Sequence, residues 1–161
     1  MESKVNIFKE AMKDAMIDNF KTCGYLVPVV FFYTGEKPII VQLPPDFMGD
    51  RTNKIALTET IRDYCIKNNC LAAGLITEAY GAKVDSNSET AKKLTSGEMR
   101  TSECDEKQDI IIMLFSTPER DELISYVVDL DKKSVGVEFS TPDMQSTMMG
   151  ILGDFFKWNK N

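Results

Sequence analysis

Three neighbouring segments constrain the fold most, because each has the pattern of a β-strand and only short turns separate them. Residues 109–116 (DIIIMLFS) are apolar at consecutive positions, which is typical of a central strand covered on both faces. Residues 123–130 (LISYVVDL) place Ser125 and Asp129 on one face of a strand and apolar side chains on the other, and the apolar residues of 135–139 (VGVEF) alternate after the turn D-K-K-S. We therefore expect an antiparallel meander of three strands here.

Two amphipathic helices are predicted earlier in the chain. Apolar residues recur at three- and four-residue spacing in residues 5–20, and Gly24 suits the left-handed position that follows a helix. A second apolar stripe covers residues 54–69, where Asn68 or Asn69 would terminate the helix.

Residues 25–33 (YLVPVVFFY) and 38–43 (PIIVQL) have the pattern of a β-hairpin, with β-branched and aromatic residues around the turn T-G-E-K. Pro28 cannot donate a hydrogen bond within a strand ladder. The first strand of this hairpin is therefore predicted at an edge of the sheet, or with a bulge.

The remaining segments complete the element order. Residues 71–86 (LAAGLITEAYGAKVDS) begin as a further strand, and the polar segment 85–108 exceeds the usual length of a connection. A short helix at SETAKKL would shorten the structureless part of that loop. Thr141 as cap and Pro142 at the first helical position predict a C-terminal helix with an apolar stripe.

We predict an α+β fold with the order α-β-β-α-β-(long loop)-β-β-β-α. At 161 residues the chain has the length of a single domain, residues 1–161, with the long polar loop 85–108 inside it. The sheet is expected to be mostly antiparallel, with about six strands and three main helices packed on it.

The absence of histidine excludes several classes of enzyme. Ser-His-Asp hydrolases, Cys-His hydrolases and H-E-x-x-H metalloproteases all need an imidazole. The chain also lacks the G-x-G-x-x-G and G-x-x-x-x-G-K-[ST] motifs, and its four cysteines form no C-x-x-C pair. We predict no cofactor and no metal site. Any catalysis would depend on carboxylates with Mg²⁺, or on Lys, Tyr or Cys.

The charge pattern and the N-terminal segment bound the possible partners. Net charge is −6, and residues 103–122 alone contribute −5 of it. No stripe of Lys and Arg is present, so direct binding to nucleic acid is not expected. The acidic segment could engage a basic partner, although a solvated pair of loops is the more common reason for such a run. With no signal-peptide core and no window of about 18 apolar residues, we predict a soluble cytoplasmic protein with reduced thiols and no membrane partner.

Glu78 is the first candidate site residue, because it is an acid in a segment that otherwise predicts a buried strand. In a strand it shares one face with Ile76 and Tyr80. A covered carboxylate needs a partner, for which Arg100 is the first choice and Arg62 the second. Alternatively, the strand end reaches solvent and Glu78 is simply exposed.

The segment PPDFMGDRTNK is a second candidate, for binding an anion such as a phosphate or a carboxylate. A glycine-containing loop that enters a helix offers free backbone N–H groups, and Arg51, Thr52 and Lys54 would add positive charge and a hydroxyl. The alternative is that Asp50 or Thr52 is an ordinary N-cap.

Several short motifs together resemble uncharacterised proteins that recur in phages and bacterial genomes. They are Pro28 with its apolar strand, Lys54 in the second helix, the strand end Glu78-Ala79-Tyr80, and Met99-Arg100-x-x-Glu103 before the next strand. In that group a Glu-Ala-aromatic strand end precedes an Arg-x-Glu-like element; here the acid lies one residue later. The resemblance covers about residues 25–130. It implies a phage or bacterial setting, in the host cytoplasm or the virion, implies no activity, and draws attention to Glu78, Tyr80, Arg100 and Glu103.

Two functions follow as hypotheses. The first is a non-enzymatic phage or bacterial accessory protein that binds a protein partner or assembles with itself. The missing catalytic groups, the acidic segment and the adaptable side chains of Met144, Met148 and Met149 support it, although core packing also explains Met148. The second is a binder of a small molecule, an anion or a nucleotide, or a carboxylate- and Mg²⁺-dependent enzyme, with Glu78 as base or ligand anchor.

Overall fold

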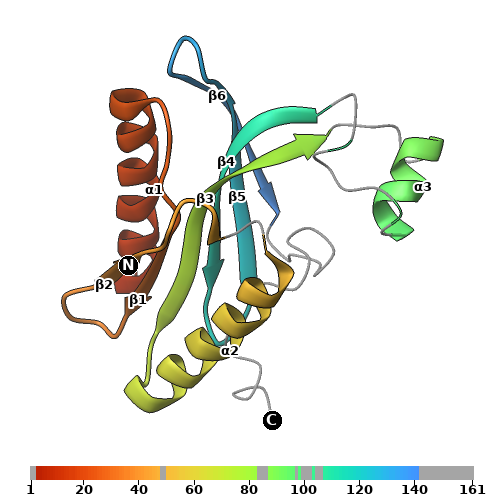
Figure 1. The fold of residues 1–161 in the computed structure, drawn as a ribbon. Coiled ribbons are helices and arrows are strands. Elements are labelled where there is room, and N and C mark those ends of the chain that lie inside the picture. Colours follow the sequence, from red (N-terminus) through yellow and green to blue (C-terminus); the bar gives the residue numbers. More distant parts are fainter. Residues whose placement is uncertain are drawn as a thin grey trace.

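Six strands form one antiparallel sheet, in the order β2-β1-β3-β4-β5-β6 (Figure 1). The computed structural model describes residues 3–47, 50–82, 87–96, 98, 103 and 107–141. The predicted α+β class and mostly antiparallel sheet are confirmed. In chain order the described elements are α1 (Lys4–Cys23), β1 (Val29–Tyr33), β2 (Ile39–Gln42), α2 (Arg51–Asn68), β3 (Ala72–Ala82), α3 (Glu89–Ser96), β4 (Lys107–Ser116), β5 (Asp121–Asp129) and β6 (Ser134–Thr141).

The two long helices cover opposite faces of the sheet. Alternate residues of β3 divide between the two hydrophobic core clusters: Ile76 lies in the cluster beneath α1, and Leu75 lies in the cluster beneath α2. This follows from the two-residue period of a strand, and it places Glu78 and Tyr80 on the same face as Ile76, as predicted; that face is the one beneath α1. The helices contribute these buried apolar residues: from α1, Phe8, Met12, Met16 and Phe20; from α2, Leu57, Ile61 and Cys65.

Both long helices end at the residues that the sequence predicts. Gly24 closes α1 with φ 82°, and its N–H donates to the Phe20 carbonyl. Asn69 closes α2 with φ 49° in the same left-handed region. Glycine and asparagine adopt this conformation at lower cost than other residues, which explains why the helices stop there.

The β1–β2 hairpin is confirmed, but the prediction that its first strand lies at an edge or carries a bulge is wrong. β1 pairs with β2 on one side and with β3 on the other, in a continuous register on both sides. Pro28 precedes β1, and its carbonyl accepts a hydrogen bond from the Leu43 N–H at 2.8 Å. A proline just before a strand removes only the last bond of the ladder, here the one to the Leu43 carbonyl, so an interior strand tolerates it. Of the two strands of this hairpin, β2 is the one at the edge of the described sheet.

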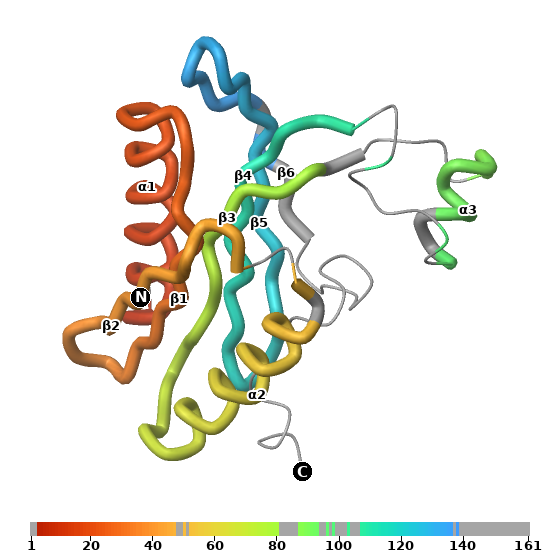
Figure 2. Tube along the Cα trace, in the orientation of Figure 1, coloured from red at the N-terminus to blue at the C-terminus, as the bar shows by residue number. Residues whose placement is uncertain are grey.

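β3 and β4 extend beyond the other strands. They pair from Ala73 to Ala82, whereas β1 reaches only Ile76 of β3, and β5 reaches only Ile110 of β4. Figure 2 shows this outer part of β3 and β4 curving toward α3, away from α1. α3 confirms the short helix that is predicted within the polar segment 85–108.

The structure covers only part of the predicted C-terminal region. β6 extends the predicted strand 135–139 at both ends, to Ser134 and Thr141. The predicted C-terminal helix, with Pro142 and Met144, Met148 and Met149, lies outside the described residues.

Gly74 is required where β3 crosses beneath the aromatic core. It pairs with Phe31 of β1 and with Phe115 of β4, and both rings are buried. A Cβ atom at this position would collide with the Leu114 carbonyl oxygen and with the Phe31 ring. The missing side chain therefore makes room for Phe31 in the cluster beneath α1.

Candidate functional site

Glu78 of β3 is exposed, and its carboxylate is bonded to the backbone of another element. Its Oε1 accepts a hydrogen bond of 2.6 Å from the Leu26 N–H. Leu26 belongs to the linker between α1 and β1. β1 pairs with β3 only as far as Ile76, so β1 does not cover the edge of β3 beside Glu78. The linker passes this edge instead. The described partner of the acid is thus a backbone amide.

The predicted guanidinium partners of Glu78 have different outcomes. Arg100 lies outside the described residues, so the Glu78–Arg100 pair stays a prediction. Arg62 belongs to α2, which covers the face of the sheet opposite to Glu78. Glu103 is described and exposed. The alternative in which the strand end reaches solvent agrees with the exposure of Glu78.

Tyr80 lies two residues further along the same face and is 47% exposed. The Lys107 ammonium of β4 lies 5.0 Å from the centroid of its ring. A cation at this distance from a tyrosine face is attracted by the ring quadrupole. Tyr80 therefore has an ammonium neighbour contributed by the chain itself.

A cavity of about 280 Å³ opens beside Glu78. Its charged lining residues are Glu78 and Asp109, and the rest of the lining is mostly apolar. Two carboxylates without a basic residue among the lining favour a cation over an anion. The other lining residues are Leu26, Pro28, Pro45, Thr77, Ala79, Tyr80, Ile110, Val128 and Leu130.

The N-terminus of α2, the predicted anion site, is capped by the chain itself. The Asp50 carboxylate accepts hydrogen bonds from the Thr52 N–H at 2.7 Å and the Asn53 N–H at 3.4 Å. The Lys54 N–H donates to the Asp50 carbonyl at 3.1 Å. A carboxylate thus occupies the position that a bound anion would take. The Arg51 side chain lies outside the described residues, and the anion site stays a prediction.

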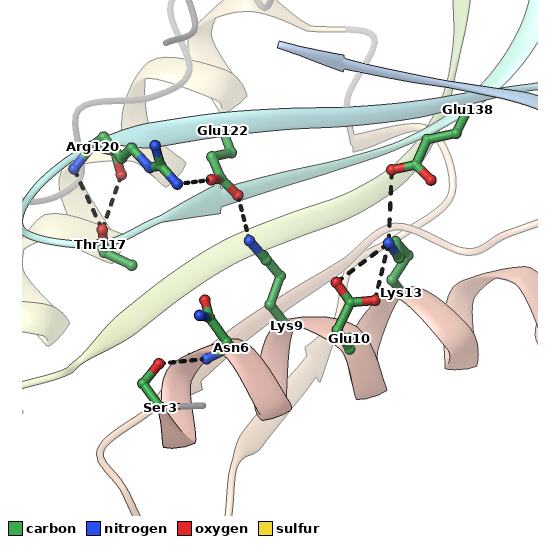
Figure 3. Close-up of polar contacts among 9 residues, drawn as sticks. All are labelled: Ser3, Asn6, Lys9, Glu10, Lys13, Thr117, Arg120, Glu122 and Glu138. Carbon is green, nitrogen blue, oxygen red and sulfur yellow. Dashed lines mark hydrogen bonds and ion pairs between the residues drawn. The ribbon is translucent and has the colours of Figure 1, made fainter. Parts of the chain in front are cut away.

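A buried carboxylate between two basic side chains is a feature that sequence reasoning missed. Glu122 of β5 is 8% exposed, and it pairs with Lys9 of α1 at 2.9 Å and with Arg120 at 2.6 Å (Figure 3). The prediction that the acidic run 103–122 is solvated is wrong for Glu122, because its side chain is buried. Charged residues, Arg120 and Asp121, precede it, and Lys9 is far from it in the chain, so the local pattern gives no sign of the pair with Lys9. A cavity of about 350 Å³ adjoins these three residues.

A second polar cluster lies further along α1. The Lys13 ammonium pairs with Glu10 at 3.0 Å and with Glu138 of β6 at 3.7 Å (Figure 3). Burial lowers the pKa of Lys13, but the hydrogen bonds and charges of Glu10 and Glu138 outweigh it and raise the pKa above the usual value. Burial, and then the hydrogen bond to Glu138, raise the pKa of the Tyr126 hydroxyl. These groups join α1 to the far edge of the sheet.

The edge strand β2 exposes three aliphatic side chains in a row. Ile39, Ile40 and Val41 are 45%, 52% and 46% exposed. β2 is the last strand of the described sheet, so its side away from β1 is not paired with any described strand. Branched aliphatic residues on an open strand edge are uncommon, because they promote pairing with other chains.

The comparisons do not assign this chain to a family. It matches no protein-family model, and neither the curated proteins nor the solved structures give a match. Among the described residues, no group of three or more Cys, Asp and Glu side chains could hold a metal ion. No described helix is both long enough and apolar enough to cross a membrane.

Proposed function

We propose that this protein is a non-enzymatic accessory protein that acts by binding, through strand addition at the β2 edge. The observation that carries the proposal is the row of exposed Ile39, Ile40 and Val41 on a strand with one unpaired side within the described sheet. An extended segment that pairs with such an edge gains main-chain hydrogen bonds, and the alternate side chains give selectivity.

The chemistry of the remaining residues supports a binding role. The chain has no histidine, which removes the commonest general base. Burial raises the pKa of the Cys65 and Cys70 thiols, so neither is a thiolate at neutral pH. The hydroxyl and thiol groups of this chain therefore have no imidazole to act as their base.

The setting that we propose is a phage or a bacterium, and the place of action is the host cytoplasm or the virion. This part rests on the resemblance of the motifs around Glu78, Tyr80, Arg100 and Glu103. In such a setting a small acidic protein would act on a host or phage protein, or on another copy of itself.

The test compares the wild type with Ile40→Pro as baits in lysates of bacteria, with isotope labelling to quantify recovered proteins. Proline at Ile40 removes an N–H that faces away from β1, so the sheet stays intact. A protein, or this chain itself, that the wild type retains and Ile40→Pro loses at least tenfold supports the proposal. Equal recovery by the two baits contradicts a role for the β2 edge.

A second function, binding of a small molecule, is favoured by the cavity beside Glu78. Its two carboxylates favour a cation such as a primary amine over the nucleotide or phosphate that the sequence suggests. Thermal shift with Mg²⁺, primary amines and inorganic phosphate separates these classes. A rise in melting temperature with one of them, lost in Glu78→Gln, supports this site; no rise with any of them argues against it.

A further inference from the structure

The open side of β2 carries a defined set of hydrogen-bonding groups. In an antiparallel pair, alternate residues direct both backbone groups toward the neighbour, and the residues between them direct theirs away. The Leu43 N–H bonds to the Pro28 carbonyl, and the register then assigns Val41 and Ile39 to bonds with β1. The N–H and C=O groups of Ile40 and Gln42 therefore face away from β1, at the sheet edge.

Prolines lie on both sides of this set. Pro38 and Pro44 occupy the same alternate positions as Ile40 and Gln42, and proline has no N–H. The outward donors of residues 38–44 are therefore limited to Ile40 and Gln42. Prolines on an edge oppose the unlimited addition of strands, so this edge suits one short partner strand.

We infer that β2 pairs with β2 of a second copy of this chain, antiparallel, with the two-fold axis at Val41. The inference rests on the proposed function and names its partner. In this register, Ile40 of each copy lies opposite Gln42 of the other, and the two residues exchange N–H···O=C bonds. Every outward N–H of Ile40 and Gln42, in both copies, then meets an outward carbonyl of the same residues.

The exposed side chains agree with the same register. Ile39 and Val41 lie on the α2 face, because their β1 partners Phe32 and Val30 belong to the core cluster beneath α2. Across the two-fold axis, Val41 meets Val41 of the second copy, and Ile39 meets Leu43. The pairing therefore covers the exposed Val41 with its own copy and the exposed Ile39 with the half-buried Leu43, and it leaves no charged group of β2 between them.

The partner is a second copy because the edge is complementary to itself. A two-fold pairing of this kind closes, so it gives a dimer and not a fibre. Four residues per strand make a contact below the standard interface size, which indicates a weak dimer. The net charge of −6 on each copy opposes association, so added salt should strengthen it.

Sedimentation velocity of the full chain, loaded from about 10 µM to about 1 mM, measures the association directly. We expect the weight-average mass to rise toward twice the monomer mass with concentration, and at lower concentration when salt is raised. Ile40→Pro and Val41→Lys should both stay monomeric, the first through the backbone and the second through charge. Ile66→Lys is the matched control, because Ile66 is an aliphatic residue of α2 that is 49% exposed, and it should associate like the wild type.

Cysteine cross-linking tests the register, in a background with Cys23→Ser and Cys104→Ser. Residues opposite one another without mutual hydrogen bonds have Cα atoms about 4.5 Å apart, within the range of a disulfide. Val41→Cys should give a covalent dimer on mild oxidation. Ile40→Cys lies opposite Gln42 of the second copy and should give at least tenfold less. Preferential cross-linking of Ile40→Cys would overturn the register.

Two outcomes separate this inference from the proposed function. A wild type that stays monomeric at every concentration and salt overturns the self-pairing. If its bait still retains another protein that Ile40→Pro loses, binding at the β2 edge stands and only the identity of the partner is wrong. If the two baits also recover the same proteins, both proposals fail.

Discussion

The Glu78 carboxylate accepts a hydrogen bond of 2.6 Å from the Leu26 backbone N–H, although the two residues are 52 positions apart in the chain. The bond joins β3 to the linker between α1 and β1, at the point where β1 has ceased to pair with β3. The Glu78 side chain therefore replaces the backbone hydrogen bonds of the strand ladder at this point. It holds the linker in place where the chain passes from α1 into the sheet.

Glu78→Ala should lower the free energy of unfolding by about 1 kcal/mol, because the Leu26 N–H loses its acceptor. The loss is not larger because the site is exposed and water can partly take the place of the carboxylate. Glu78→Gln is the matched variant: its amide oxygen can still accept, so its loss should be smaller. Urea unfolding followed by circular dichroism measures both. If Glu78→Ala is as stable as the wild type, the bond is incidental to the fold.

Substitution of the buried Glu122 should lower the free energy of unfolding more than substitution of Glu78. Glu122→Gln removes the charge between Lys9, whose side chain is 18% exposed, and Arg120, and leaves Lys9 without its anionic partner. Breaking one side of a largely buried pair is costly, and we expect a loss of about 2 kcal/mol in unfolding free energy. Chemical denaturation of Glu122→Gln, Lys9→Met and the double variant gives the coupling between the two residues.

The control for Glu122 is an exposed ion pair of α3. Glu89 and Lys92 lie 3.7 Å apart with side chains that are 83% and 66% exposed, so Glu89→Gln should change stability by less than about 0.5 kcal/mol. Equal losses in Glu122→Gln and Glu89→Gln would contradict the importance of burial.

Gly74→Ala tests the packing of β3 against Phe31. The added methyl group collides with the Leu114 carbonyl and the Phe31 ring, and both belong to a sheet that cannot shift freely. We expect a loss of about 2 kcal/mol or more, since overpacking a core typically costs 1–3 kcal/mol. Gly136→Ala places a Cβ 3.2 Å from the Val127 carbonyl oxygen, a milder contact, and should cost less. Melting temperatures by differential scanning calorimetry rank the two; the reverse order would contradict this account.

The strands and helices could be predicted because their signals are local. Residues 109–116 are apolar at every position after Asp109 up to Phe115, and β4 is indeed covered by α1 on one face and borders the α2 cluster on the other. Gly24 and Asn69 ended the helices for a reason that lies in their own backbone. The edge assignment of β1 failed because no local pattern says which strand of a hairpin pairs with a third strand.

The partners at the candidate sites could not be predicted, because they are backbone groups or distant residues. The Leu26 N–H that binds Glu78 has no side-chain signature, and every residue except proline offers the same group. Lys9 and Glu122 are brought together only when α1 docks on β5. Sequence reasoning correctly identified Glu78 as unusual and correctly assigned its face, but the bond it makes depends on the tertiary fold.

The buried thiols of Cys65 and Cys70 predict how the protein responds to alkaline pH. Burial raises the pKa of both thiols above the ordinary thiol value of 9.0, whereas the same thiols ionise near that pH in the unfolded chain. A group with a raised folded-state pKa contributes stability that is complete below the unfolded pKa and declines as pH rises above it. We therefore expect stability to fall from about pH 9 upward, with a limit of about 1.4 kcal/mol per pH unit for each thiol.

Thiol labelling at pH 8 should modify exposed Cys23 within minutes and spare Cys65 and Cys70 until unfolding; rapid labelling of either buried thiol in the native protein would refute their burial.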